Sequence, residues 1–140
     1  MGRLIAIDFG LKRCGVAVTD DEQIFAFGHD TVPTYQLLDF IDNYQKTASV
    51  SGIIVGMPMR LHNQPSEITK QVNMFISQCK SRFPKLKHHT YDERFTSKIA
   101  TQSIYDSGLG RKARSDKALV DKVSATILLQ SFLTAQNNMP

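Results

Sequence analysis

The sequence predicts an α/β fold, a mixed sheet with helices on both faces. The chain opens with three short apolar segments separated by turns, the pattern of an antiparallel meander. Short branched apolar runs then alternate with longer segments of helical periodicity. That alternation is typical of strand–helix units, whose strands pair in parallel.

Length and composition indicate one globular domain over residues 1–140 with a polyanionic partner. Hydrophobic residues make up 41% and charged residues 21%, while the net charge is +4. Cys14 and Cys79 lack metal-type spacing, so we expect reduced core thiols and a cytoplasmic protein. The N-terminus does not resemble a signal peptide, and no apolar run approaches a membrane span.

The first expected strand, residues 4–8, ends in an acid. Residues 4–7 are apolar and branched, which suits a strand buried on both faces, and Asp8 follows them. A carboxylate there needs a metal, a cation or a set of hydrogen bonds. The alternative is that Asp8 only caps the next turn through its side chain. That turn, 9–13, leads to a second strand over 14–19 and, after residues 20–22, to a third over 24–32.

The rest of the chain supplies two more strands and four helices. Residues 52–56 form a short apolar segment typical of a central parallel strand, and residues 87–91 a less apolar one that suits a sheet edge. Thr34 can cap the first helix, and Gly108 ends the third. The expected helices cover residues 34–46, 66–83, 96–107 and, starting at Ser115 or Asp116, a segment reaching about residue 136.

Acids from three different elements, two strands and the last helix, are placed to meet at one edge of this sheet. Sites in open α/β sheets form at the carboxyl ends of the strands, where Asp8 and the Asp92–Glu93 pair lie. Asp121 shares a stripe of the last helix with apolar residues, at spacings of three and four. The alternative for Asp121 is an ion pair with Lys117 or Lys122 on a solvated face.

Clustered carboxylates repel one another unless a cation lies between them. Mg²⁺ and Mn²⁺ prefer oxygen ligands, and two such ions about 4 Å apart can activate water and stabilise the leaving oxygen of a phosphodiester. We therefore expect Mg²⁺ or Mn²⁺ as the cofactor, with two ions. A zinc site is not indicated, because His88 and His89 are adjacent and would point to opposite faces of a strand.

Basic residues accompany these acids, as a phosphate backbone would require. Without ligand, we expect the basic loop 110–117 to be a solvated, flexible segment, which is compatible with contacts to phosphates when nucleic acid binds. The candidate nucleic-acid contacts are Lys12, Arg13, Arg94, Arg111, Lys112, Arg114 and Lys117.

Four sequence blocks resemble one known family. DFGLKRCGVAVTD, IIVGMP, DERFTS and KALVDKVSATILLQSFL are similar, in order and spacing, to the signatures of the YqgF (RuvX-type) family of the RNase H-like superfamily. The resemblance implies a three-layer RNase H-like fold with strand order 3-2-1-4-5, and it matches the family's acids to Asp8, Glu93 and Asp121. The chain departs from the family at Phe9, Ala118 and residues 60–63.

The resemblance also implies an activity, metal-dependent hydrolysis of phosphodiester bonds. The expected substrate is the 5′ end of the small-subunit (16S) ribosomal RNA precursor, with branched DNA such as a Holliday junction as the alternative. The expected partner is nucleic acid, with no membrane, and a weak homodimer is allowed. Two other classes stay open: a non-catalytic nucleic-acid-binding module, and an ATP-binding domain of the sugar-kinase and actin group, which normally needs two such domains.

Overall fold

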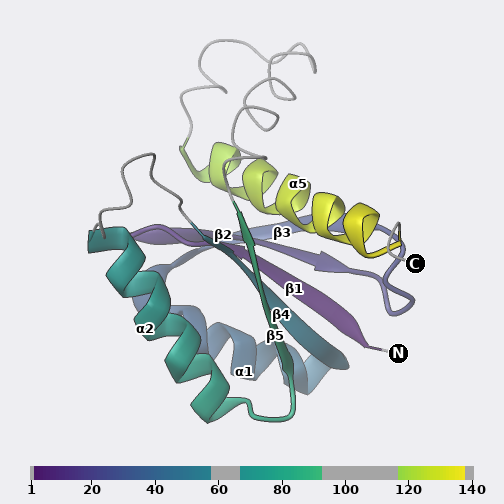
Figure 1. Ribbon diagram of the computed structural model, residues 1–140, viewed down its shortest axis with the longest axis horizontal. Coiled ribbons are helices and arrows are strands. Elements are labelled where there is room, and N and C mark those ends of the chain that lie inside the picture. The colour runs from purple at the N-terminus through teal and green to yellow at the C-terminus, as the bar shows by residue number, and fades with distance from the viewer. Residues whose placement is uncertain (1, 58–66, 93–116, 138–140) are drawn as a thin grey trace.

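Five strands form one mixed sheet in the order β3-β2-β1-β4-β5 (Figure 1). The computed structural model describes residues 2–57, 67–92 and 117–137, with the backbone alone for 117–121 and 137. The first three strands pair antiparallel, β4 is parallel to β1, and β5 is parallel to β4. The strands are β1 (Arg3–Asp8), β2 (Arg13–Thr19), β3 (Ala26–Pro33), β4 (Val50–Met57) and β5 (Lys87–Asp92). The predicted mixed sheet and its strand order are confirmed.

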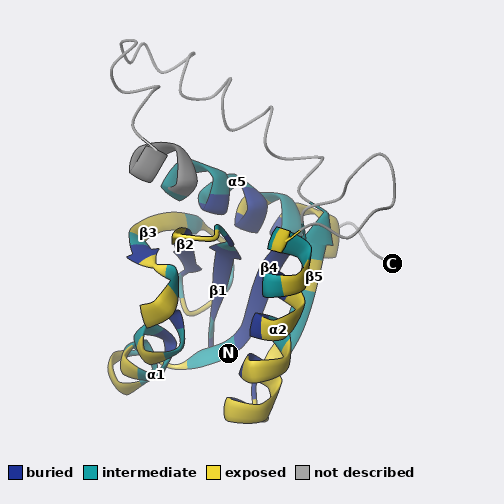
Figure 2. Cartoon of the chain, turned by 90° about the vertical axis from the view of Figure 1, so that its left-hand side faces the viewer, coloured by how far each residue is buried: buried dark blue, intermediate teal, exposed yellow. Residues whose placement is uncertain are grey.

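Helices cover both faces of the sheet and make three layers, as predicted (Figure 2). The short 3-10 helix η1 (Thr34–Gln36) leads into α1 (Leu37–Thr47), which shares one face with α2 (Glu67–Arg82). The opposite face is covered by α5 (Lys117–Asn137). The helix predicted over 96–107 lies outside the described residues. No helix in the described parts of the chain is both long and apolar enough to cross a membrane.

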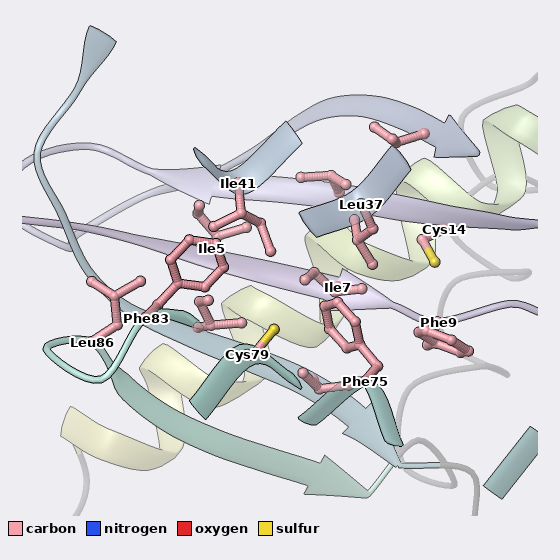
Figure 3. Close-up of a cluster of buried hydrophobic side chains, with 14 of the residues drawn as sticks. Ile5, Ile7, Phe9, Cys14, Leu37, Ile41, Phe75, Cys79, Phe83 and Leu86 are labelled. Carbon is pink, nitrogen blue, oxygen red and sulfur yellow. The ribbon is translucent and has the colours of Figure 1, made fainter. Parts of the chain in front are cut away.

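Alternation along the strands divides the core into two clusters, one on each face of the sheet. In β1, Ile5 and Ile7 pack toward α1 and α2, whereas Leu4 and Ala6 pack toward α5. Figure 3 shows the first cluster, in which Phe75 from α2 lies close to Phe9. Nearly all side chains of both clusters are buried. The same alternation determines on which face of the sheet a polar side chain at the end of a strand lies.

The third strand begins two residues later than predicted. Ile24 and Phe25 lie outside β3 because their N–H groups both donate to the side chain of Asp20, each at 2.8 Å. Gln23, with a φ of 59°, completes that turn. The apolar pattern suggested a strand from residue 24, but the acceptor at Asp20 holds these two residues in the turn.

The predicted cap at Thr34 is also wrong. Helix η1 has Pro33 at its N-cap position and no side-chain cap hydrogen bond. The Thr34 hydroxyl instead donates to the carbonyl oxygen of Gly10 at 2.7 Å. A residue suited to capping has been used for a tertiary contact, which local sequence could not reveal.

The two cysteines are buried, as predicted, and they are not joined in a disulfide. Cys14 lies in β2 and Cys79 on the sheet-facing side of α2. Burial raises the pKa of the Cys79 thiol to about 12. Both residues therefore belong to the packing of the domain rather than to its chemistry.

Candidate active site

Asp8 is a half-buried acid at the carboxyl end of the central strand. Its position in β1 follows Leu4 and Ala6 by steps of two, so its side chain points to the α5 face. The apolar residues before it are fully or almost fully buried. The carboxylate is thus held by a strand that has little freedom to move.

A glycine lies directly beside this acid on the neighbouring strand. Asp8 pairs with Gly15 of β2, and paired residues present their side chains on the same face. Gly15 is buried and has no side chain, so no side chain of β2 lies directly beside the carboxylate of Asp8 at this pair.

The turn after Asp8 is fixed by Thr34. The Thr34 hydroxyl donates to the carbonyl of Gly10, and its backbone N–H donates to the carbonyl of Lys12 at 3.0 Å. Gly10 is required, since an added Cβ would collide with the carbonyl oxygen of Arg13. These contacts hold the turn in a defined position directly after Asp8.

Lys12 and Arg13 project from this turn into solvent. Within the described ranges every ion pair involves Arg3 or Arg82, so neither cation of the turn is engaged by an acid there. Both charges are available to an anionic ligand. Their contact with a phosphate backbone stays a prediction.

Asp92 is the last residue of β5. His89 and Tyr91 pack against Phe132 of α5, at ring-centroid distances of 5.0 and 6.5 Å. The alternate positions of the strand face α2, so Asp92 points away from the face that carries Asp8. Glu93 lies outside the described residues. Of the two acids, Asp92 does not meet Asp8.

Helix α5 begins at the end of the sheet where β1 and β4 finish (Figure 1). Lys122 and Thr126 lie against Gly28 of β3, and the helix then crosses the sheet toward β5. Asp121 is in the first two turns of α5, so its backbone lies at the same end as Asp8. The side chain of Asp121 is outside the described part of the chain.

Comparison of the sequence with known protein families identifies the family of this chain. The family model RuvX, described as Holliday junction resolvase, matches residues 2–135. The chain belongs to the RuvX family. This confirms the family that its four sequence blocks indicated.

The relatives of this RuvX-family chain span its length. A Bacteroides fragilis protein is 50% identical over 133 residues, covering 95% of this chain and 96% of its own. A Phocaeicola vulgatus protein is 50% identical over 136 residues, with 97% and 98% covered. A Flavobacterium johnsoniae protein is 44% identical over 136 residues, with 97% and 99% covered. All three bear the name "Putative pre-16S rRNA nuclease".

A solved structure with the same fold is Thermus thermophilus RuvC in complex with a Holliday junction substrate. Its TM-score is 0.60 at 13% sequence identity, and the match covers 97% of this chain and 96% of that chain. At this identity the likeness concerns the fold alone. The predicted RNase H-like class of the RuvX-family chain is confirmed.

Of the other residues predicted to bind nucleic acid, the structure describes only part of one. Lys117 is the first residue of α5, with the backbone alone described. Arg94, Arg111, Lys112 and Arg114 lie outside the described residues, as does most of the basic loop 110–117. Among the described residues no three acids, histidines or cysteines form a metal cluster. Because Glu93 and the side chain of Asp121 are not described, this leaves the three-acid site a prediction.

The two histidines of β5 lie on opposite faces of the sheet, as their adjacency predicted. The Nε2 atom of His88 is 3.0 Å from the carbonyl oxygen of Phe83, whereas the ring of His89 packs on Phe132. Burial is the main cause that lowers the pKa of His89, and Lys87 adds to it. The pair does not share a ligand.

The sequence interpretation missed two contributors to this edge, Gly15 and Thr34. A glycine signal was visible in the second strand, but its position opposite Asp8 depends on the register of the hairpin. Thr34 carried a misleading signal, because threonine before an apolar helix normally suggests a cap. Both roles arise from contacts between segments distant in sequence.

Proposed function

We propose that this chain is a metal-dependent nuclease that acts on the 5′ end of pre-16S ribosomal RNA. The observation that carries the proposal is the half-buried carboxylate of Asp8 at the end of the central strand, on the face covered by α5. It stands in a chain that is 50% identical, over nearly its full length, to relatives named for this activity. Such a role would place the protein in the cytoplasm, with nucleic acid as its partner.

The catalytic and metal-binding residues in this proposal are Asp8, Glu93 and Asp121. Continuing the alternation of β5 by one residue would turn Glu93 toward the face of Asp8, since Tyr91 already points there. Asp121 lies one helical turn before Ala125, which is buried against the sheet. Each acid would therefore come from a different element and approach the same edge.

These residues suit Mg²⁺ or Mn²⁺, because carboxylate oxygens are the ligands that hard divalent ions prefer. When bound, one or two such ions would activate a water molecule and stabilise the leaving oxygen of a phosphodiester. On β2 the residue paired with Asp8 is Gly15, so no side chain of that strand competes with a ligand for the carboxylate. Bound ions would also relieve the mutual repulsion of the acids.

The cations of the chain would position the polynucleotide. Lys12 and Arg13 stand exposed on a turn held by Thr34, so they can meet phosphates on either side of the cleaved bond without losing backbone order. Arg94 and the loop residues Arg111, Lys112, Arg114 and Lys117 would extend this contact.

A second candidate substrate is a Holliday junction. The description of the matching family model favours it, since that model is described as Holliday junction resolvase. The chemistry at Asp8 would be the same for both substrates, so only the nucleic acid distinguishes the two proposals. A cleavage assay with both substrates therefore has to accompany any test of the site.

The deciding experiment is the Asp8→Asn variant, assayed on pre-16S rRNA and on a four-way junction with Mg²⁺ or Mn²⁺. Asparagine keeps the size of the side chain and removes the charge, so cleavage should fall by roughly 10²- to 10³-fold or more. The rise in melting temperature on adding metal should disappear. Without metal, the variant should be as stable as the wild type or slightly more so, because a like charge has been removed.

Asp92→Asn is the matched control, as it removes a carboxylate at the same edge that points to the other face. It should retain cleavage and metal-dependent stabilisation. Cleavage at the wild-type rate by Asp8→Asn would refute the mechanism. Cleavage of only the junction would refute the RNA substrate while leaving the nuclease intact. Sedimentation of the same samples would test the predicted weak homodimer.

A further inference from the structure

A groove of about 640 Å³ opens on the α1/α2 face, beside the turn that follows Asp8. The rings of Phe9 and Phe75 form its floor, 5.5 Å apart and almost fully buried (Figure 3). One wall comes from η1 and α1, with Tyr35 and Leu38, and the other from α2. Its volume falls within the roughly 300 to 1,000 Å³ typical of small-ligand sites.

Three apolar or aromatic residues around this groove are exposed. Tyr35 is 84% exposed, Leu11 54% and Met74 55%, and all three line the groove. Apolar side chains gathered at a concave site usually mark a binding surface. The hydroxyl of Tyr35 accepts a hydrogen bond from Gln36 at 2.9 Å, which restrains the ring at the mouth of the groove.

The charge of the lining selects the kind of ligand. Lys12 is the one charged residue among the described residues that line the groove, and no acid lies there. Gln71 and Gln78, two helical turns apart on α2, supply amides that can bind a ligand. The amide nitrogen of Gln71 also donates to Glu67 at 3.2 Å, which leaves its carbonyl oxygen to accept a hydrogen bond. An aromatic ring, amides and a cation are the groups that bind an unpaired nucleobase and its phosphate.

The position of the groove connects it to the proposed active site. Asp8 points to the α5 face and the groove opens on the opposite face, so the turn over residues 10–13 lies between them. The exposed cations Lys12 and Arg13 occupy that turn. A polynucleotide with one phosphate at Asp8 and a base in the groove would cross the turn and meet these cations on the way.

We propose that this groove receives an unpaired nucleobase of the substrate, stacked on Tyr35, from the strand whose phosphate is cleaved at Asp8. The inference rests on the proposed function and deepens it, because a base can enter the groove only from a single-stranded segment. The substrate is then a nucleic acid with an unpaired segment near the cut site, rather than a fully paired duplex.

A tryptophan at position 35 provides a direct test, since the chain has no tryptophan of its own. In Tyr35→Trp, single-stranded RNA should quench the indole fluorescence saturably, and a duplex of the same sequence should not. The titrations are made with a metal chelator, so that binding is measured without cleavage. Tyr35→Ala should weaken single-strand binding by roughly tenfold, as expected for one stacked base, whereas Tyr35→Phe should stay within about twofold.

Phe25→Ala is the matched control, because Phe25 is another exposed aromatic residue, 60% exposed, that does not line the groove. It should bind single strands like the wild type. Equal losses for Phe25→Ala and Tyr35→Ala, or an unquenched indole at saturating RNA, would overturn the inference. A fluorescence change that depends on protein concentration alone would also overturn it, in favour of a second copy in the groove.

The two proposals fail separately in these experiments. If wild-type protein cleaves RNA but the indole stays unquenched, the proposed nuclease activity is supported and the groove does not bind a base. If the indole is quenched but nothing is cleaved with Mg²⁺ or Mn²⁺, base binding in the groove is supported and the chain is a binding module.

Discussion

The two faces of the sheet present side chains of different sizes from the same strands. Toward α1 and α2, β1 and β2 present isoleucine, valine and cysteine, with Ile7 and Val16 at the centre. Toward α5, β1 presents Leu4 near its start, and beyond it the two strands present only the small residues Ala6, Gly15 and Ala17 before Asp8. A face of large side chains buries more apolar surface, while a face of small ones lets a helix approach the backbone closely. The first arrangement favours stability and the second favours a site between strand and helix.

The close approach of α5 is visible at Gly28. A Cβ added there would lie 2.9 Å from the Thr126 hydroxyl and 3.1 Å from carbons of Lys122. The Thr126 hydroxyl is itself engaged with the carbonyl of Lys122 at 2.8 Å, so it cannot easily give way. The α5 face therefore has little tolerance for added volume near the first turns of the helix, which contain Asp121.

The largest expected effect comes from Ile7→Ala, on the face of large side chains. Ile7 is fully buried, and its truncation should lower the free energy of unfolding by about 2 to 5 kcal/mol, measured by urea denaturation. The folded fraction should keep its metal-dependent stabilisation, since Asp8 points to the other face. A selective loss of metal response in well-folded Ile7→Ala would contradict the division between the faces.

Ala17→Leu should lower the stability of the protein less than Ile7→Ala does, but it should reduce cleavage more. Ala17 is fully buried beneath α5, so the added carbons should cost about 1 to 3 kcal/mol and shift the helix. Because Asp121 lies on that helix, we expect cleavage to fall at least tenfold at a temperature where the variant is folded. Val16→Ile adds volume at the adjacent position on the opposite face and should leave cleavage within about threefold. Equal cleavage by Ala17→Leu and Val16→Ile would contradict the inference that the active site lies on the α5 face.

Thr34→Val tests the turn that joins the two faces. The change removes the hydrogen bond to Gly10 and leaves a carbonyl without that donor, at a cost of roughly 0.5 to 1.5 kcal/mol. Nucleic-acid binding should weaken slightly because Lys12 and Arg13 are less well positioned. Thr34→Ser, which keeps the hydroxyl, should behave like the wild type in both thermal unfolding and binding. A Thr34→Ser variant as weak as Thr34→Val would show that the methyl group, and not the hydroxyl, matters.

The smallest effect, absent at neutral pH, concerns Cys79. Its pKa is raised from an ordinary value of 9.0 to about 12, so the folded state favours the neutral thiol. The unfolded protein releases this proton first, and stability should therefore fall as the pH rises from about 9 to 12. Chemical denaturation of Cys79→Ala should show a shallower fall over that range. Identical slopes for the variant and the wild type would show that Cys79 does not contribute.

Much of the architecture could be predicted from the pattern of apolar residues. The short branched run before Asp8 and the alternation of such runs with helical segments correctly predicted the strands and the mixed sheet. The stripe containing Ala125 and Leu128 correctly predicted the buried face of the last helix. Prediction failed where a polar side chain bound backbone outside a helix or strand. Asp20 shortened the third strand by holding a local turn, and Thr34 bound a distant turn instead of capping a helix.

The sequence by itself determined the order of the strands and helices that the structure describes, the family, and the set of acids that deserve a catalytic test, because these depend on local periodicity and on short motifs. Only the tertiary structure decided which faces Asp8 and Asp92 occupy. The strand pleat and the packing of α5 turn Asp8 toward that helix and Asp92 away from it, although both end a strand at the same edge. It also decided that Gly15 lies beside Asp8, because pairing register is set by contacts between strands and not by either strand alone.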